Sequence, residues 1–184
     1  MRRCVLLISL LVLELCGAAY AAGATNAWID VPFVKQRKDG CGAASMAMVM
    51  AYWQQQEGWP ASPSARATHI LQALYSIPAH GIYASAMVRY LQQNGYRTFV
   101  FAGRWPDLER EIAKGRPLIV GLRPDASRSL HYVVVSGVDD PQQLVLLNDP
   151  AQRKLLKVKR SRFEHEWQAT KDWTLLAVPR PSPH

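Results

Sequence analysis

Apolar residues in the first half of the chain recur at helical spacing. Residues 42–56 are rich in Ala and Met and contain no Gly or Pro after Gly42, which predicts a buried helix that begins close to Cys41. Residues 65–75 and 83–94 carry apolar side chains at i, i+3 and i+4 spacing, and Gly95 predicts where the second of these helices ends. The pattern therefore predicts a helical N-terminal half.

The pattern changes after Gly95 to short runs rich in β-branched residues. Strands are predicted at residues 97–101, 117–122, 131–138, 144–148, 155–158 and 173–178. Short helices are predicted at residues 106–114 and 163–168, and an extended segment at residues 29–34. Asp139, Asp140 and Pro141 predict a hairpin turn between two of the strands. The predicted fold class is α+β, with helices leading and an antiparallel sheet following.

The opening segment is typical of an export signal. Arg2 and Arg3 form a charged start, residues 5–16 are apolar except for Glu14, and residues 19–21 (Ala-Tyr-Ala) form a small-x-small cleavage site. We therefore expect residues 1–21 to be a signal peptide and the exported protein to be periplasmic or secreted.

The rest of the chain, residues 22–184, is of a length that suits one domain, and we expect it to act as a monomer. The signal segment is shorter than the roughly 20 apolar residues of a transmembrane helix, and no later segment qualifies. An alternative is a lipid anchor on Cys16, but Leu15 is larger than the small residue expected before an acylated cysteine.

Charge adds little to this picture. Loss of two arginines and one glutamate with the signal would change the net charge from +8 to +7. Basic residues cluster only near the C-terminus, at Lys154, Lys157, Lys159, Arg160 and Arg162. Because the remaining Lys and Arg residues are scattered, we interpret the cluster as a solvated face and expect no nucleic-acid partner.

Cysteine usage is more informative. Cys4 and Cys16 lie in the predicted signal, so Cys41 would stand alone after cleavage and could form no internal disulfide. An unpaired thiol in an oxidising compartment is typical of a catalytic nucleophile, although a buried cysteine can also serve as a small apolar side chain.

The position of Cys41 favours the catalytic interpretation. Helix N-termini stabilise anions, so a cysteine there is biased toward the thiolate that attacks carbonyl carbon. Gly42 would leave that thiol accessible, and the Cys41 N–H could bind a developing oxyanion. Gln36, five residues upstream, offers a side-chain amide for the same purpose.

A thiolate nucleophile needs a base, and residues 22–184 contain five histidines: His69, His80, His131, His165 and His184. His131 opens the most β-branched run in the chain, which would anchor its backbone while its side chain sits at a strand end. The other four lie in polar segments or at the terminus and are interpreted as exposed.

The predicted hairpin supplies a third group. A three-residue loop at residues 139–141 would pair Val138 with Gln142 and place His131 opposite Asp149, about 5 Å apart on one face. A two-residue loop would instead put Pro150 opposite and turn Asp149 to the other face. Residues 148–150 (Asn-Asp-Pro) are also typical of an ordinary turn after a strand.

Three segments together resemble a known family. VPFVKQRKDGCGAASMAMVMAYW at residues 31–53, HYVVVSGVDD at 131–140 and LLNDP at 146–150 are similar to the peptidase C-39-like family, which includes double-glycine-leader peptidases and stand-alone exported members. The resemblance implies a papain-like fold over about residues 31–178. It also implies the roles of nucleophile, base, orienting carboxylate and oxyanion donor for Cys41, His131, Asp149 and Gln36.

The chain departs from transporter-linked members of that family in one place. There the cysteine directly follows an aspartate, whereas here Gly40 intervenes and Gln36 stands one residue closer to the cysteine. The resemblance implies hydrolysis of peptide bonds in a peptide or protein substrate. We expect no cofactor, and no metal either, because one cysteine and scattered histidines give no ligand cluster.

Two rival functions remain. A cell-wall amidase of the NlpC type also uses a cysteine at a helix start and a histidine on a strand, but LLNDP is more similar to the C-39-like pattern. A non-catalytic envelope adaptor with a papain-like fold would bind peptides without needing a reactive thiol. Four aromatic residues, Trp53, Trp59, Tyr83 and Trp105, could line a substrate groove, but their spacing is more typical of a core.

Overall fold

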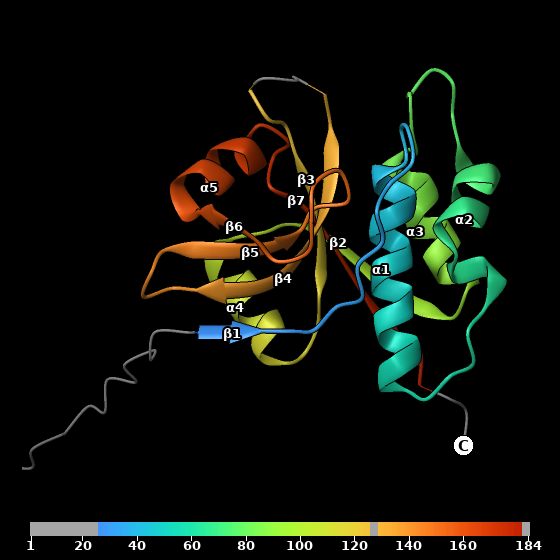
Figure 1. Cartoon of the computed structure of the whole chain (residues 1–184), viewed down its shortest axis with the longest axis horizontal. Coiled ribbons are helices and arrows are strands. Elements are labelled where there is room, and N and C mark those ends of the chain that lie inside the picture. The colour runs from blue at the N-terminus through green and yellow to red at the C-terminus, as the bar shows by residue number, and fades with distance from the viewer. Residues whose placement is uncertain (1–25, 126–128, 182–184) are drawn as a thin grey trace, which may run out of the picture.

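The computed structural model describes residues 26–125 and 129–181 (Figure 1). The predicted signal peptide at residues 1–21, the alternative anchor at Cys16 and the terminal His184 lie outside the described residues. Within the described ranges, no helix is long and apolar enough to cross a membrane.

Three helices and a single turn of 3-10 helix (η1) form one side of the molecule, as Figure 1 shows. They are α1 (Cys41–Gln56), η1 (Pro63–Ala65), α2 (Ala67–Leu74) and α3 (Ala84–Gln93). The helix predicted at residues 65–75 was too long at its start, because the Ser62 cap and Pro63 begin a separate turn, η1, which ends at Ala65 before α2 begins.

The rest of the chain forms a seven-stranded antiparallel sheet with two further helices. The strands are β1 (Asn26–Trp28), β2 (Tyr96–Ala102), β3 (Leu118–Leu122), β4 (His131–Asp139), β5 (Leu144–Asn148), β6 (Leu156–Lys159) and β7 (Trp173–Pro179). Their order is β2-β7-β3-β4-β5-β6, and β1 pairs with β4. The predicted α+β class is confirmed. The extended segment predicted at residues 29–34 is not a strand, because pairing with β4 ends at Trp28.

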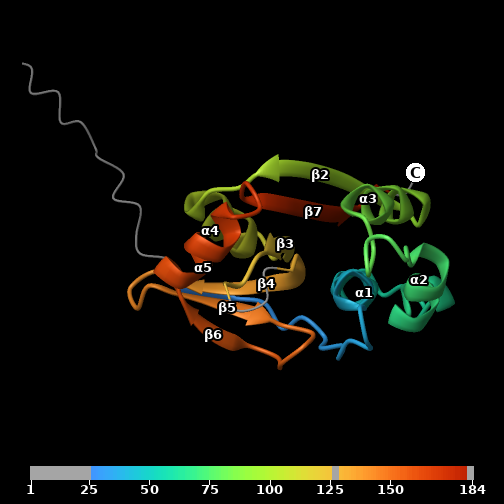
Figure 2. The ribbon, with the colours of Figure 1, turned by 90° about the horizontal axis from the view of Figure 1, so that it is seen from above.

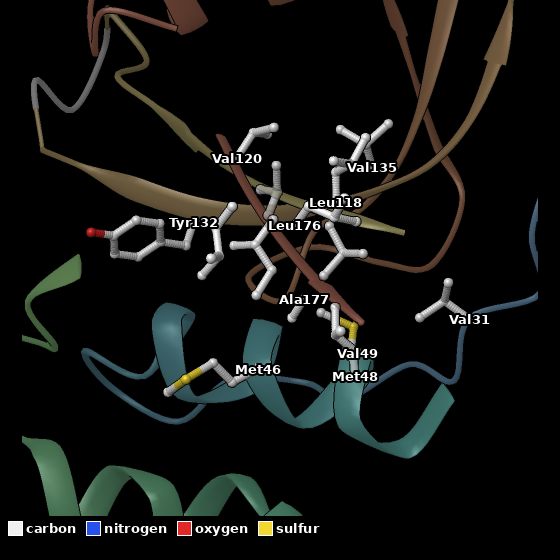
Figure 3. Packing of buried hydrophobic residues seen from close by; sticks show 14 of the residues in the cluster. Val31, Met46, Met48, Val49, Leu118, Val120, Tyr132, Val135, Leu176 and Ala177 are labelled. Carbon is white, nitrogen blue, oxygen red and sulfur yellow. The ribbon is translucent and has the colours of Figure 1, made fainter. Parts of the chain in front are cut away.

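Helix α1 is the centre of the core. Ten of its 16 residues are buried, and it packs on β3, β4 and β7 on one side and on α2 and α3 on the other. Figure 3 shows Leu118, Leu176 and Ala177 lying between the sheet and this helix. Such burial on almost every side explains why α1 is apolar around its whole circumference rather than along one stripe.

The opposite face of the sheet is covered by α4 (Trp105–Ala113) and α5 (Arg160–Gln168), as Figures 1 and 2 show together. Helix α4 packs on β4 and β3, and α5 packs on β3, β5 and β6. Strand β3 is therefore covered on both faces, which agrees with its five consecutive buried residues.

The β4–β5 hairpin differs from its predicted register. Strand β4 ends at Asp139 and β5 begins at Leu144, so the connection spans residues 140–143 instead of 139–141. The Asp139 carboxylate accepts a hydrogen bond from the Gln142 N–H at 3.1 Å, and Gln143 adopts φ 53°. These two features close a longer turn than the sequence prediction allowed.

The longer turn alone would place Asp149 on the opposite face of the sheet from His131, and a β-bulge at Ser136 restores it to the same face. Val138 pairs with Val145, but beyond the bulge Val135 pairs with Leu147, two residues from the predicted partner. A shift of two residues preserves the face of every side chain. Asp149 therefore follows β5 on the face of His131, which an unbulged ladder with this turn would not allow.

Candidate active site

Cys41 is the first residue of α1, and the structure leaves this helix end free for an anion. The N-cap residue is Gly40, no side chain caps the helix, and the first turn contains no acidic residue. The N–H groups at a helix start have no intrahelical acceptor, so they can serve an external negative charge. The Cys41 side chain is only partly buried.

Interactions around Cys41 favour its thiolate. Burial by itself raises the pKa of the thiol, but a hydrogen bond with His131 and the backbone N–H groups of Tyr132 and Gly42 lower the pKa below its ordinary value overall. The charge of His131 acts in the same direction. The direction of this pKa shift is the one expected of a reactive cysteine.

His131 lies between Cys41 and Asp149. Its Nε2 is 2.8 Å from Asp149 Oδ1, which leaves Nδ1 for the thiol. Burial by itself lowers the pKa of His131, but the hydrogen bonds with Asp149 and Cys41 raise it to about 9. Burial likewise favours protonation of Asp149, yet the hydrogen bond from His131 holds the pKa of that carboxyl below its usual range. The three groups form one hydrogen-bonded chain.

The loop after β5 fixes the carboxylate of Asp149 from the other side. Asp149 Oδ1 accepts the Ala151 N–H at 2.9 Å, and Oδ2 accepts from Gln152 Nε2 at 2.6 Å. Asp149 therefore belongs to an ordinary turn, as the sequence Asn-Asp-Pro at residues 148–150 indicated, and it is also the partner of His131. Sequence reasoning missed Gln152, although a carboxamide three residues after a turn aspartate was the available signal.

Asn148 was also missed as a supporting residue. It is fully buried, and its side chain donates to Val31 O at 3.0 Å and accepts from Leu155 N at 3.0 Å. These bonds join the end of β5 to the segment before α1 and to the start of β6. The Asn148 side chain thus holds together two loops that carry site residues.

Gln36 lies on the same cleft as the triad. Its backbone N–H donates to Pro150 O at 2.9 Å, which ties it to the loop that carries Asp149. Its side-chain Oε1 is buried without a hydrogen-bond partner among the described residues. Because Oε1 makes no hydrogen bond, the carboxamide can rotate to present its NH₂ group without losing a bond at that oxygen.

The two walls of the site are joined directly behind Cys41. Ser45 Oγ in α1 donates to Tyr132 O in β4 at 3.2 Å. A side chain on Gly42 would meet Met87, Tyr132 and Ile82 at 3.4–3.5 Å. These are ordinary van der Waals distances, so the packing of α1 does not require glycine at this position, and the access that the sequence interpretation assigned to Gly42 stays a prediction.

The four predicted site residues line one cleft of about 1050 Å³. It extends from Cys41 and His131 along Leu130 and Leu147 to β6 and α5. Its volume is at the upper end of the range typical of small-ligand pockets, and its lining residues come from several elements. The structure brings Cys41, His131, Asp149 and Gln36 together, although their catalytic roles stay predictions.

The other histidines differ in position. His69 is exposed, and the exposed His165 lies 3.3 Å from Asp125 Oδ1. His80, although exposed as expected, lines the cleft in a tight turn with φ 44°. Among the described residues, no three His, Cys, Asp or Glu side chains are grouped as metal ligands.

None of the four aromatic residues considered as a substrate groove lines the cleft. Trp105 is buried under Arg160, whose guanidinium lies 4.4 Å from the ring centroid. Trp53 donates to Ala177 O, and Trp59 packs edge-on against Tyr96. Tyr83 is exposed outside the cleft.

Comparison with known proteins identifies the family. The sequence profile of the Peptidase_C39 like family matches residues 28–174. No match is found among curated protein sequences.

Solved structures show the same fold. A Bacillus anthracis protein described as a C39-like peptidase superposes with a TM-score of 0.66 at 17% identity, over 86% of this chain and 100% of the other. A double glycine motif protease from an AMS/PCAT transporter, in complex with the leader peptide, gives 0.62 at 21% identity, over 85% and 97%. The peptidase domain of Streptococcus ComA, a bifunctional ABC transporter involved in a quorum sensing pathway, gives 0.60 at 21% identity, over 80% and 97%.

Proposed function

The chain belongs to the Peptidase_C39 like family, and we propose that it is an exported cysteine peptidase with Cys41, His131 and Asp149 as its catalytic triad. The observation that carries this proposal is the continuous hydrogen-bonded chain from Asp149 through His131 to Cys41, at the end of an open cleft. A triad is recognised by such geometry rather than by sequence position.

The reaction follows from this geometry. The Cys41 thiolate attacks the carbonyl carbon of a peptide bond, and the oxyanion is held by the Cys41 N–H and the Gln36 amide. The His131 imidazolium gives its proton to the amine nitrogen as the C–N bond breaks, which leaves a thioester on Cys41. His131 then removes a proton from water, which attacks the thioester and releases the acid.

Each supporting group has a defined part in this cycle. The Asp149 carboxylate accepts a hydrogen bond from His131 Nε2–H. This bond keeps the proton on Nε2 and leaves Nδ1 to face the reacting atoms. Gln152 and the Ala151 N–H hold the carboxylate while its charge stabilises the imidazolium. The raised pKa of His131 and the lowered pKa of Cys41 both favour the ion pair of imidazolium and thiolate.

The decisive test compares the wild type with Cys41→Ala on a mixture of envelope polypeptides. Mass spectrometry should find fragments with new termini only with the wild type, and a thioester-linked acyl group on Cys41 after rapid acid quenching. A peptide that accumulates uncut in cells carrying Cys41→Ala would identify the substrate. Cleavage that survives the substitution would overturn the proposal.

The adaptor alternative is separated by thiol reactivity. A peptide-binding module needs no activated cysteine, so its iodoacetamide reactivity at neutral pH should not exceed that of the denatured chain. The proposed peptidase should react faster when folded than when denatured. Hydrolysis of the amide bond that joins a wall peptide to its amino sugar, instead of a bond between ordinary residues, would point to an amidase.

Export is proposed from the charged and apolar pattern of residues 1–21. The protein recovered from outside the cytoplasm should begin near Ala22 and carry no lipid, as read by intact-mass and N-terminal analysis. A diacylated N-terminus at Cys16 would contradict this and indicate a membrane anchor.

A further inference from the structure

The basic cluster near the C-terminus separates into two groups in the structure. Three of its members are paired with carboxylates: Lys154 with Asp30, Arg160 with Glu164, and Arg162 with Glu166. Neither Lys154 nor Arg160 lines the cleft. Most of the cluster is thus occupied in bonds that stabilise the chain itself.

The remaining two lysines face the cleft. Lys157 and Lys159 are exposed, line the same cleft as Cys41, and have no carboxylate partner within 4.0 Å among the described residues. They alternate with Leu156 and Val158 on β6. Residues two apart on a strand share a face and are separated by about 6.6 Å, so the lysines form a matched pair of positive charges.

The acidic residues of the cleft do not offset this charge at the β6 end. Asp149 is bonded to His131, and Glu166 is paired with Arg162 at 2.9 Å. Asp39 lies at the other end and accepts from Tyr75. The β6 end of the cleft is therefore positive.

Strand β6 also offers backbone groups. Within the described ranges it pairs only with β5, at the end of the strand order. All four of its residues line the cleft, which is expected if the cleft runs along the open edge of the strand. An extended peptide could pair with that edge, and its side chains at alternate positions would then lie beside the two lysines.

We propose that the cleft selects extended peptides with acidic side chains at alternate positions, recognised by Lys157 and Lys159 on the open edge of β6. This inference rests on the proposed peptidase function, because it names the substrate class of the same cleft. The competing interpretation is that lysines on an edge strand only prevent the strand from pairing with other chains.

The test measures binding without catalysis. Fluorescein-labelled peptides of Ala and Gly with a central Glu-Ala-Glu, Glu-Glu or Gln-Ala-Gln are titrated with the Cys41→Ala chain by fluorescence anisotropy. Two exposed ion pairs predict about tenfold tighter binding of Glu-Ala-Glu than of Gln-Ala-Gln. The affinity of the Glu-Glu peptide should lie between these two. The difference should shrink as ionic strength rises from about 0.01 M to 0.15 M, where the Debye length falls to about 8 Å.

Paired variants assign the effect to β6. Lys157→Gln with Lys159→Gln should remove the preference for Glu-Ala-Glu, whereas Lys171→Gln with Arg180→Gln, the same charge change outside the cleft, should keep it. Circular dichroism checks that each variant is folded.

Three results would overturn the inference: equal binding of the acidic and neutral peptides, no binding of any of them, or a preference that survives the β6 substitutions. Self-association of the β6 variant by light scattering, with an unchanged peptide preference, would assign the lysines to protection of the edge. If the wild-type chain binds acidic peptides preferentially but cleaves no peptide, this inference stands and the proposed catalysis is contradicted.

Discussion

The two walls of the cleft hold their reactive groups by different means. Cys41 is positioned by the start of one long buried helix, so its place follows from a few consecutive residues and the burial of α1. His131 begins β4 and Asp149 directly follows β5, and their contact depends on the turn, the bulge at Ser136 and the loop after β5.

The difference predicts unlike responses to substitution. The Cys41 thiolate is stabilised by a hydrogen bond from His131 and also by the backbone N–H groups of Tyr132 and Gly42, which side-chain changes leave in place. On the sheet wall, a side-chain carboxylate orients a side-chain imidazole, and other side chains orient the carboxylate. Chemistry should therefore be most sensitive on the sheet wall, and the following experiments rank that sensitivity.

The largest effect is expected at Asp149. Asp149→Asn keeps the shape of the side chain but removes the carboxylate that fixes the His131 tautomer, so kcat should fall by up to about 10⁴-fold with little change in folding. Peptide cleavage assays and thermal unfolding measure the two quantities. Asp125→Asn, an exposed change of the same kind, is the control, and a similar loss in both variants would contradict the assignment.

A smaller loss is expected on the nucleophile side. Gln36→Ala removes a proposed oxyanion donor and should lower kcat by about 10²–10³-fold, the effect typical of one such donor. KM should change less, because the oxyanion exists only in the transition state. Gln55→Ala at the exposed end of α1 serves as the control, and a Gln36 variant as active as this control would exclude the role.

Asn148 should affect stability more than chemistry. Asn148→Ala leaves Val31 O and Leu155 N without their side-chain partner in the interior, at about 1–3 kcal/mol for each group. We expect the free energy of unfolding to fall by roughly 2–4 kcal/mol in urea titrations. Asn94→Ala, which loses one bond to Tyr90 O, should cost about 1 kcal/mol. A turnover loss equal to that of Asp149→Asn would mean that the orienting residue was misassigned.

The smallest expected change is in the pH dependence of Cys41 alkylation. Because the pKa of Cys41 is lowered, iodoacetamide labelling should stay fast below the free-cysteine value of about 8.5. His131→Ala should move the midpoint upward, while His165→Ala should leave it unchanged. If the pH midpoint of alkylation in the wild type equals that of free cysteine and does not change in His131→Ala, Cys41 is a structural thiol and not a nucleophile.

The sign of each shift also sets the active pH window. The ion pair is lost at low pH, when the thiolate is protonated below its lowered pKa, and at high pH, when His131 loses its proton near pH 9. The raised pKa of His131 stabilises the fold below the free-histidine value of about 6.5, and this contribution disappears as the pH rises through about 9. Activity should therefore decline on the alkaline side near pH 9, which initial-rate profiles can check.

Local sequence signals sufficed for most elements. The absence of Gly and Pro within residues 43–56 and the β-branched run at residues 131–138 predicted α1 and β4 to within one residue at each end. Both are long, buried segments whose patterns arise from their own core contacts. Strand β1 was not predicted and the helix near residue 65 was predicted too long, because tertiary pairing and a proline-initiated turn decide their limits.

The sequence by itself determined the order of helices and strands, the place of Cys41 at a helix start and the place of His131 at the start of a strand, because each depends on neighbouring residues. Only the tertiary structure decided how His131 reaches Asp149. The predicted register was off by two residues, and the longer turn and the bulge at Ser136 together kept the carboxylate on the correct face. It likewise decided which lysines of the basic cluster face the cleft, since ion pairing with distant carboxylates is a non-local property that spacing along the chain does not encode.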